Sequence, residues 1–142
     1  LTGMRWSDIQ KLTWEKLTMI DPRATFNHIK TGQLQYLYLP SDATMLLDSP
    51  GEAHERVFKG LRYSSYTNVA LTQWMLRAGI TKHITFHCAR HTFAVRMLTN
   101  DVDIYTVSKL IGHSELKTTQ IYTDIIDRKR KEAMTTLPSL FQ

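Results

Sequence analysis

The spacing of apolar residues predicts a chain made mostly of helices. Near its start, Trp6, Ile9 and Leu12 recur at every third position, which indicates a short helix over this stretch. A second helix is expected over residues 64–78, followed by Gly79 as a suitable C-terminal residue. The residues expected on the core-facing side of this second helix are Val69, Leu71, Trp74, Met75 and Ala78.

The stretch between these two helices has the pattern of strands. Three short apolar runs, separated by turn-forming residues, cover residues 17–20, 24–30 and 34–39. They predict a three-stranded antiparallel sheet in which Lys30 lies at the tip of the second hairpin, next to Gly32. A short helix over residues 41–47 and a loop over residues 52–63 complete this part of the chain.

The last third of the chain predicts four more helices. They are expected over residues 86–99, 104–111, 117–122 and 124–136. Thr85, Asp103 and Ser114 are suitable N-caps for the first three, because their side-chain oxygens can accept from free backbone N–H groups. Gly112 suits the end of the second helix, and Pro138 the end of the last. The predicted fold class is mixed α/β, mostly α-helical with a small three-stranded antiparallel sheet.

Composition and net charge exclude only a few classes of protein. The chain has 142 residues, a formal net charge of +5 at pH 7 and a single cysteine, Cys88. One cysteine excludes an internal disulfide, and no apolar run approaches the ~20 residues that span a bilayer. A basic domain of this size can form one core, and it fits a polyanionic partner without requiring one.

The helix expected over residues 86–99 aims a charged group at the core. Each helical residue advances about 100° around the axis. Arg90 therefore lies about 40° from Phe86, at the edge of the apolar stripe, and His87 lies about 100° from it. A buried guanidinium needs partners for its charge and its donors. Both an internal carboxylate and a bound oxyanion such as phosphate satisfy this need.

Histidines and the cysteine near Arg90 suggest a metal site only weakly. His83, His87 and His91 follow one another at single-turn spacing, but a zinc site needs four ligands, or three and a water. Pairing Cys88 with His91 as nucleophile and base is also disfavoured, because adjacent turns hold the two apart. No metal and no cofactor are expected. His91 lies about 140° from Phe86, off the apolar face, and is interpreted as structural support.

Other reactive side chains each have an ordinary structural interpretation. Asp8 can brace Arg5 on one face of the first helix, and Lys30 can be a solvated hairpin lysine. His113 can end a helix, and Tyr122 can be a core aromatic. Taken together, the arginines, histidines, lysine and tyrosine are the groups needed to hold a phosphate and attack it.

Four segments carry the pattern of one known family. They are Thr2-Gly3-Met4-Arg5-Trp6-Ser7-Asp8, His87-Cys88-Ala89-Arg90-His91, Leu110-Ile111-Gly112-His113 and Thr118-Thr119-Gln120-Ile121-Tyr122. The first is similar to a T-G-x-R-x-S-E/D segment, the next two to H-x-x-R-H and L-G-H boxes, and the last to a nucleophile segment. The chain thus resembles the catalytic domain of tyrosine recombinases of the phage-integrase type, as far as about Asp127. Within this family, the sequence most resembles the bacterial integrases of mobile elements.

The resemblance implies six catalytic residues and one supporting residue, Asp8. The six are Arg5, Lys30, His87, Arg90, His113 and Tyr122. The two arginines would clamp the phosphate oxygens, and His113 would donate a hydrogen bond to them. Lys30 would protonate the leaving 5′-oxygen, while His87 would assist proton transfer with the nucleophile Tyr122.

The implied reaction needs no metal and proceeds through a covalent 3′-phosphotyrosine, which a 5′-hydroxyl of another strand then attacks. The implied process is DNA integration or excision in the bacterial cytoplasm, in association with the nucleoid. The implied partners are double-stranded DNA, further copies of the protein in a tetramer, and accessory DNA-bending proteins, without a membrane.

The resemblance further implies that residues 1–142 are a fragment. An N-terminal DNA-binding domain and the first helix of the catalytic domain would precede Leu1, so we expect these residues alone to bind DNA weakly and not to recombine it. The tail after Tyr122 would dock on a neighbouring protomer, with Leu140 and Phe141 as its anchors.

Two alternative functions stay open. Type IB topoisomerases share this chemistry and relax DNA by rejoining the original strand. Residues 103–122 also resemble two helices around a glycine turn, as in a non-enzymatic helix-turn-helix DNA-binding module. That second alternative leaves Arg5, Lys30, His87 and Arg90 without a role.

Overall fold

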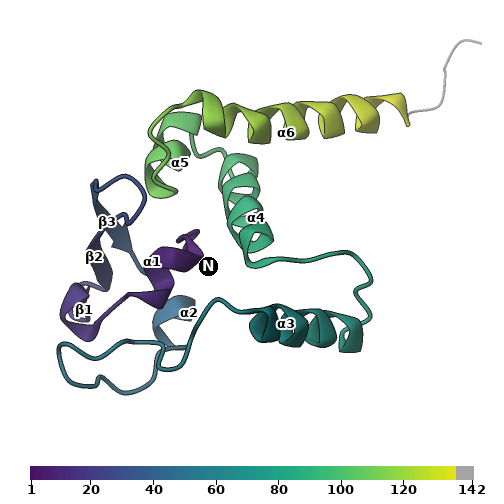
Figure 1. Ribbon diagram of the computed structural model, residues 1–142. Coiled ribbons are helices and arrows are strands. Elements are labelled where there is room, and N and C mark those ends of the chain that lie inside the picture. The colour runs from purple at the N-terminus through teal and green to yellow at the C-terminus, as the bar shows by residue number, and fades with distance from the viewer. Residues whose placement is uncertain (137–142) are drawn as a thin grey trace, which may run out of the picture.

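A small sheet and a group of helices lie on opposite sides of the N-terminal segment in the computed structural model, which describes residues 1–136 (Figure 1). The elements are α1 (Trp6–Gln10), η1 (Trp14–Lys16), β1 (Leu17–Thr18), β2 (Arg23–Asn27), β3 (Leu34–Tyr38), α2 (Ser41–Thr44), α3 (Ser65–Arg77), α4 (Phe86–Thr99), α5 (Ile104–Leu110) and α6 (Lys117–Thr135). Leu140 and Phe141, the expected anchors of the tail, lie outside the described residues.

The sheet has the order β1-β2-β3 with both pairs antiparallel, which confirms the predicted three-stranded sheet. Its inner face carries Ala24 and Phe26 of β2 and Leu37 of β3, and Ala24 lies opposite Leu37. These side chains form one buried cluster with three residues from outside the sheet, Leu12, Trp14 and Val57. The cluster fixes the base of the β2–β3 hairpin, and hence the direction in which its loop points.

A second buried cluster lies among α4, α5 and α6. It contains Ala94, Val107, Ile111 and Tyr122, each of which is 0–1% exposed. One residue of this cluster, Tyr122, is the expected nucleophile. The two clusters share no buried member, so the sheet and the helices each have an apolar core of their own.

The end of α5 has the hydrogen bonds of a Schellman motif. The N–H of Gly112 donates to the carbonyl of Lys109, and the N–H of His113 donates to the carbonyl of Ser108, both at 2.9 Å. Gly112 has φ +61°, a value that costs a residue with a Cβ about 1–2 kcal/mol. At the other end, the N–H of Thr106 donates to Oδ1 of Asp103 at 2.9 Å, which confirms the predicted cap.

The two helices predicted over residues 117–122 and 124–136 are one helix, α6, and Leu116 rather than Ser114 is its N-cap. Neither glycine nor proline interrupts the sequence from 117 to 135. Asp124, which could have capped a second helix, instead accepts from Nε2 of Gln120 on the helix surface at 3.4 Å. Tyr122 therefore lies inside a long helix and not on a short terminal one.

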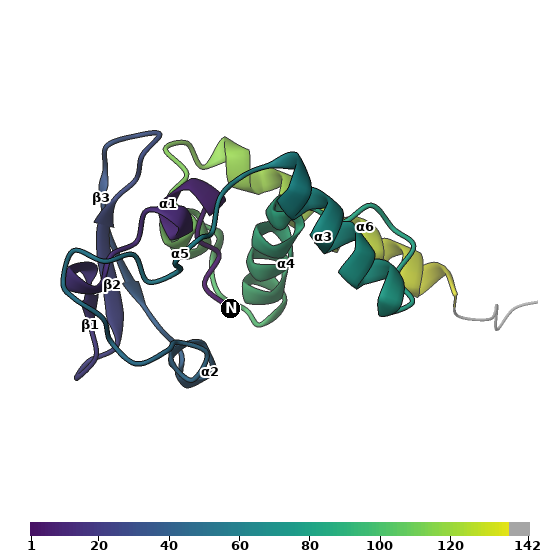
Figure 2. The same cartoon turned by 60° about the horizontal axis from the view of Figure 1, so that its bottom comes forward.

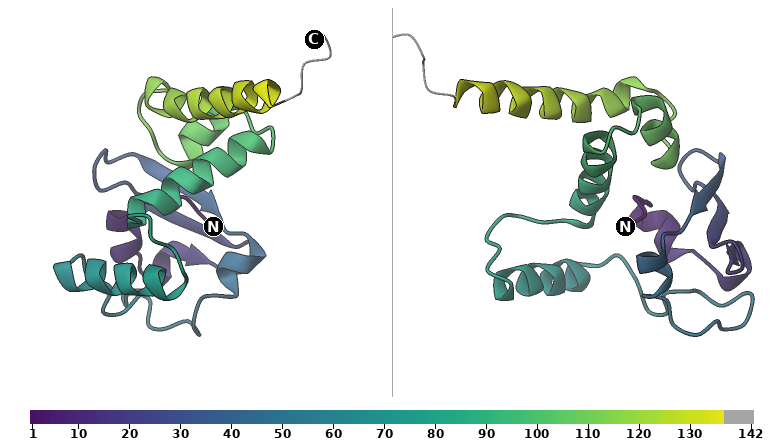
Figure 3. Two further views of the ribbon diagram at one scale, coloured as in Figure 1. Left: turned by 90° about the vertical axis from the view of Figure 1, so that its right-hand side faces the viewer. Right: turned by 180° about the vertical axis from the view of Figure 1, so that it is seen from behind.

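Of the five residues expected on the core-facing side of α3, Leu71 and Met75 are half-buried and the other three are exposed. Val69 is 53% exposed and Trp74 is 66% exposed, and α3 contains no buried residue. Figures 2 and 3 show α3 between two long connections, apart from the sheet. Within residues 1–136, its apolar side chains thus find little surface to pack against. No helix in this part of the chain is long and apolar enough to cross a membrane.

Replacing Gly112 with alanine is expected to lower the free energy of unfolding by roughly 3 kcal/mol, because strain at positive φ adds to overpacking. A Cβ at this position would overlap the ring of His28. Gly60→Ala is the matched control, since Gly60 has φ +78° but no atom within 4 Å of an added Cβ. Urea unfolding measures both, and equal losses for the two variants would contradict the packing at Gly112.

Candidate active site

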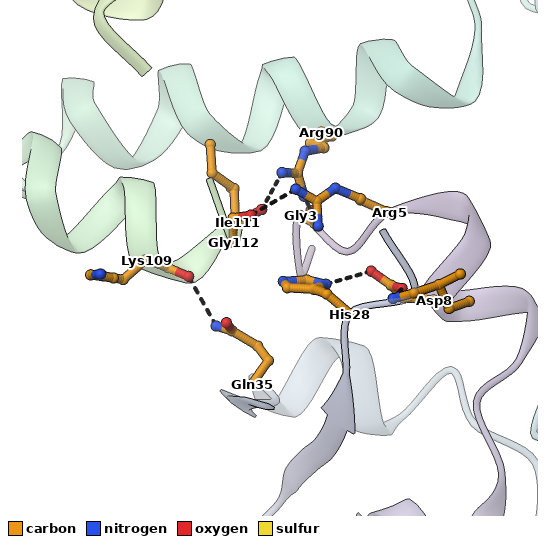
Figure 4. A network of polar contacts seen from close by, with 10 residues as sticks. Gly3, Arg5, Asp8, His28, Gln35, Arg90, Lys109, Ile111 and Gly112 are labelled. Carbon is orange, nitrogen blue, oxygen red and sulfur yellow. Dashed lines mark hydrogen bonds and ion pairs between the residues drawn. The ribbon is translucent and has the colours of Figure 1, made fainter. Parts of the chain in front are cut away.

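Arg5 and Arg90 meet at the junction between the sheet and the helices (Figure 4). Arg5 precedes α1, and its Nη2 donates to the carbonyl of Gly112 at 2.6 Å. Arg90 on α4 donates from Nη1 to the carbonyl of Gly3 at 2.8 Å and from Nη2 to the carbonyl of Ile111. The two guanidinium groups are thus fixed by backbone atoms of the first residues and of the α5–α6 turn.

The charges of these arginines have no carboxylate partner. None of the ion pairs in residues 1–136 involves Arg5 or Arg90, although Arg90 is only 3% exposed. Burial, and then the charge of Arg5, lower the pKa of Arg90 to about 10, so the group stays protonated at neutral pH. Of the two partners considered for Arg90, the internal carboxylate is therefore wrong. Nη1 of Arg5 is also buried without a hydrogen-bond partner in this part of the chain, so a donor remains for an anion.

A cavity of about 680 Å³ brings four of the predicted residues together: Arg5, Lys30, His87 and Arg90 all line it. Lys30 reaches it from the loop between β2 and β3, and the exposed His87 from the first turn of α4. Since α1, the hairpin and α4 are far apart in sequence, their convergence is a property of the fold. The cavity is cationic and open enough for a phosphodiester.

Tyr122 lies in the helical core and is not among the residues that line this cavity. It is 1% exposed, and its ring centroid lies 5.3 Å from that of His91 and 6.5 Å from that of His113. Burial raises the pKa of Tyr122, and the charge of Arg90 opposes this effect. The hydroxyl is therefore protonated at neutral pH and needs a proton acceptor before it can act as a nucleophile.

His113 is a neutral imidazole at physiological pH. Burial, followed by the charges of Arg90 and Arg5, lowers its pKa from 6.5 to about 4. Its Nδ1 is hydrogen-bonded to Oγ1 of Thr119 at 2.9 Å, and Thr119 is fully buried at the start of α6. The ring is thus held by a side chain of the same helix that carries Tyr122.

His91 lies closer to the chemistry than the sequence suggested. The centroid of its ring lies 4.4 Å from that of the His87 ring and 5.3 Å from that of the Tyr122 ring, so His91 lies between the two. Burial, and then the charges of His87 and Arg90, lower its pKa, which leaves it neutral and able to accept a proton. The signal in the sequence was the i, i+4 spacing from His87, which places both rings on one helix surface.

Asp8 does not pair with Arg5 as predicted. Its Oδ2 lies 2.7 Å from Nδ1 of His28, and its Oδ1 accepts from the N–H of Ile29 at 3.1 Å (Figure 4). Asp8 is buried on α1 and faces the β2–β3 loop, whereas Arg5 extends toward Gly112. His28 was missed because nothing in the sequence distinguishes it from an exposed residue of the hairpin.

Within residues 1–136, no group of three or more His, Cys, Asp or Glu side chains is arranged to hold a metal ion. The rings of His87 and His91 meet edge to face, at an interplanar angle of 89°. The site therefore offers cationic and neutral nitrogen donors, and a backbone-held arginine pair as its main source of charge.

The model of the phage integrase family matches residues 1–129. The chain belongs to the phage integrase family. Its relatives include the tyrosine recombinase XerC of Xanthomonas campestris pv. campestris (strain B100), 32% identical over 133 residues, which are 87% of this chain and 41% of the relative. Another is XerD of Lacticaseibacillus casei, 46% identical over 55 residues, or 39% of this chain and 19% of the relative. The chain thus spans less than half the length of these relatives.

Solved structures with the same fold confirm the predicted fold class. The crystal structure of XerA recombinase aligns with a TM-score of 0.73 and 23% identity, over 97% of this chain and 55% of that one. The catalytic domain of bacteriophage HP1 integrase aligns with a TM-score of 0.63 and 23% identity, over 87% of this chain and 68% of that one. Both likenesses concern the fold.

The lowered pKa of His113 predicts a pH dependence of stability. As the pH falls from 6.5 to about 4, the unfolded chain gains a proton on residue 113 that the folded protein does not. The contribution of His113 to the free energy of unfolding therefore declines through this window and levels off below it. Urea unfolding across this pH range should show a smaller decline for His113→Gln. An NMR titration that placed the pKa of His113 near its ordinary value would contradict this.

Proposed function

We propose that this protein is a site-specific DNA recombinase that cleaves and rejoins strands through a covalent 3′-phosphotyrosine at Tyr122, without a metal ion. The observation that carries the proposal is the pair Arg5 and Arg90, whose charges have no carboxylate partner in residues 1–136 and which line one cavity with Lys30 and His87. A phosphodiester bound there would supply the missing negative charge.

The arginines bind and activate the phosphate. Planar guanidinium groups match phosphate oxygens well, and two of them stabilise the charge that develops in the pentavalent transition state. Arg90 is fixed through Gly3 and Ile111 before substrate arrives, so little reorganisation is needed. Arg5 offers a further donor for the phosphate, because its buried Nη1 has no hydrogen-bond partner within residues 1–136.

Histidines act on the attacking oxygen of Tyr122 and on a non-bridging oxygen of the phosphate. The ring of His91 lies between those of His87 and Tyr122, and these two imidazoles are the proposed acceptors of the phenolic proton. If the Thr119 hydroxyl donates to Nδ1 of His113, the imidazole hydrogen is on Nε2, where it can bond a phosphate oxygen. A neutral His113 then acts as a donor without adding a third positive charge.

Lys30 protonates the departing 5′-oxygen. An alkoxide is a poor leaving group in water, so a positioned acid accelerates its departure by about 10²–10⁴-fold. Lys30 comes from the hairpin and lines the same cavity as the arginines, where an acid for the leaving oxygen is needed. The 5′-hydroxyl of another strand reverses these steps, with Lys30 as the base.

Double-stranded DNA is the proposed substrate. The net charge of +5 favours a polyanion, and structurally similar proteins have been solved with DNA, among them XerH bound to its difH substrate. Tetramer formation through the tail at Leu140 and Phe141, accessory DNA-bending proteins, and action at the bacterial nucleoid in the cytoplasm belong to the same proposal. So does a preceding DNA-binding domain, with the first helix of the catalytic domain, in the full-length protein.

A nicked suicide substrate tests the nucleophile. The full-length protein should become covalently attached to DNA, and Tyr122→Phe should reduce attachment below detection, since the reacting oxygen is lost. Tyr105→Phe is the matched control, because Tyr105 is 61% exposed on α5, and it should react at the wild-type rate. Attachment by Tyr122→Phe would refute the assignment. Relaxation of supercoiled plasmid without strand exchange would favour a type IB topoisomerase activity instead.

Replacing Arg5 with lysine should slow cleavage of the same substrate by about 10²–10³-fold, because lysine keeps the charge but loses the planar pair of donors. Arg77→Lys, in the last turn of α3, is the control and should leave the rate unchanged. Rates are measured with excess enzyme, so that they report the chemical step. A loss of less than threefold in Arg5→Lys would mean that Arg5 does not contact the transition state.

A further inference from the structure

We propose that His28 is a positioning residue, which holds the backbone before Lys30 so that the lysine can deliver its proton to the leaving oxygen. The role depends on Lys30 acting as the general acid of the proposed reaction. His28 touches neither the nucleophile nor the cavity lining; it acts through the loop that carries Lys30 and through the turn that carries His113.

His28 and Asp8 form a buried polar pair beneath the cavity. His28 is 2% exposed, and its Nδ1 lies 2.7 Å from Oδ2 of Asp8, whose side chain is fully buried. A carboxylate only accepts hydrogen bonds, so Nδ1 carries the hydrogen and donates it. The other oxygen of Asp8 accepts from the N–H of Ile29 at 3.1 Å. One carboxylate of α1 therefore holds the side chain of one loop residue and the backbone of the next.

The backbone of His28 also closes the loop. Its N–H donates to the carbonyl of Gln33 at 2.9 Å, and its carbonyl accepts from the N–H of Gly32 at 2.7 Å. Lys30 lies two residues beyond this point and is exposed to the cavity. The backbone on both sides of Lys30 is thus fixed by hydrogen bonds of residues 28, 29, 32 and 33, and the side chain of Lys30 extends from it to the cavity.

The far side of the imidazole ring lies against Gly112. A Cβ on Gly112 would overlap Nε2 of His28, so the ring fills the space that the missing side chain leaves. Nε2 is buried and has no hydrogen-bond partner within the described residues. Because the carbonyl of Gly112 accepts from Arg5, the ring of His28 packs on the same turn that fixes the first arginine. Three segments of the site therefore meet at this one side chain (Figure 4).

Packing alone would not require the polar pair of His28 and Asp8 at this position. Phe26 already contacts the ring of His28 edge to face at 5.3 Å, and an apolar residue could fill this place. A buried hydrogen bond between two side chains, in contrast, fixes direction and distance more narrowly than apolar contact does. The pair of Asp8 and His28 thus fits a site where the position of the next residues matters to the chemistry.

The test compares two suicide substrates in the full-length protein. One is ordinary DNA, and in the other sulfur replaces the bridging 5′-oxygen at the cleavage site. A thiol has a pKa of ~8.5, far below that of an alcohol, so the sulfur leaves as a thiolate without an acid. A defect that acts through Lys30 should therefore disappear with the sulfur substrate, and any other defect should remain.

With the oxygen substrate, His28→Leu should lose about 10²-fold in cleavage rate, as expected when a general acid is misplaced. With the sulfur substrate, it should return to within a few-fold of the wild-type rate, as should Lys30→Ala. His28→Asn should retain more activity than His28→Leu, because its amide can still donate to Asp8. His54→Asn, at an exposed position in the loop after α2, should match the wild-type protein on both substrates.

The ratio of sulfur to oxygen rates within one preparation is independent of how much of the variant is folded. If Lys30→Ala is rescued by sulfur and His28→Leu is not, the role proposed for His28 is wrong and the proposed reaction stands. If neither is rescued, Lys30 is not the acid, and both assignments fall. If Tyr122→Phe cleaves either substrate, the proposed function itself is wrong.

Discussion

The structure depends on a joint made of arginine hydrogen bonds to backbone carbonyls. The sheet and the helices have separate buried cores, and the partly buried Leu110 of α5 packs against the core of the sheet. Arg90 reaches from α4 to Gly3 near the N-terminus, and Arg5 reaches from α1 to the turn after α5. A further bond, from Nε2 of Gln35 on β3 to the carbonyl of Lys109, extends the joint. The two arginines that form this joint also line the cavity of the proposed active site.

The charge of the joint governs the neighbouring groups. Burial lowers the pKa of His113, and the charges of Arg90 and Arg5, which have no carboxylate partner in residues 1–136, lower it further. The charge of Arg90 also contributes to the lowered pKa of His91. The same charge opposes the effect of burial on the pKa of Tyr122. An anion bound between the arginines would weaken these effects together. Binding of an anion between the arginines and the proton affinities of the histidines are therefore coupled.

Much of the fold and of the candidate site could be predicted from the sequence. Helical geometry placed Arg90 at the edge of an apolar stripe, the family resemblance pointed to Arg5, and apolar runs with turn and capping residues predicted the sheet, α4 and α5. Three features could not be predicted, because they depend on what a side chain meets in space. Asp8 is near Arg5 in sequence but faces the hairpin, so it holds His28. The apolar residues of α3, such as Trp74, have helical spacing without a partner surface. α6 continues past Asp124 because a surface bond to Gln120 replaces the expected cap.

The acceptors that hold the arginines are main-chain oxygens, and no substitution can delete such an oxygen. A new side chain at Ile111 keeps the acceptor of Arg90 in place. At Gly3 and Gly112, which have φ +64° and +61°, a new side chain would strain the backbone and overlap the rings of Phe93 and His28 respectively. These carbonyls also do not titrate, unlike a carboxylate. The spacing of the two guanidinium groups is thus insensitive to acid and is set by backbone conformation, which depends on glycine at two of the three anchor points.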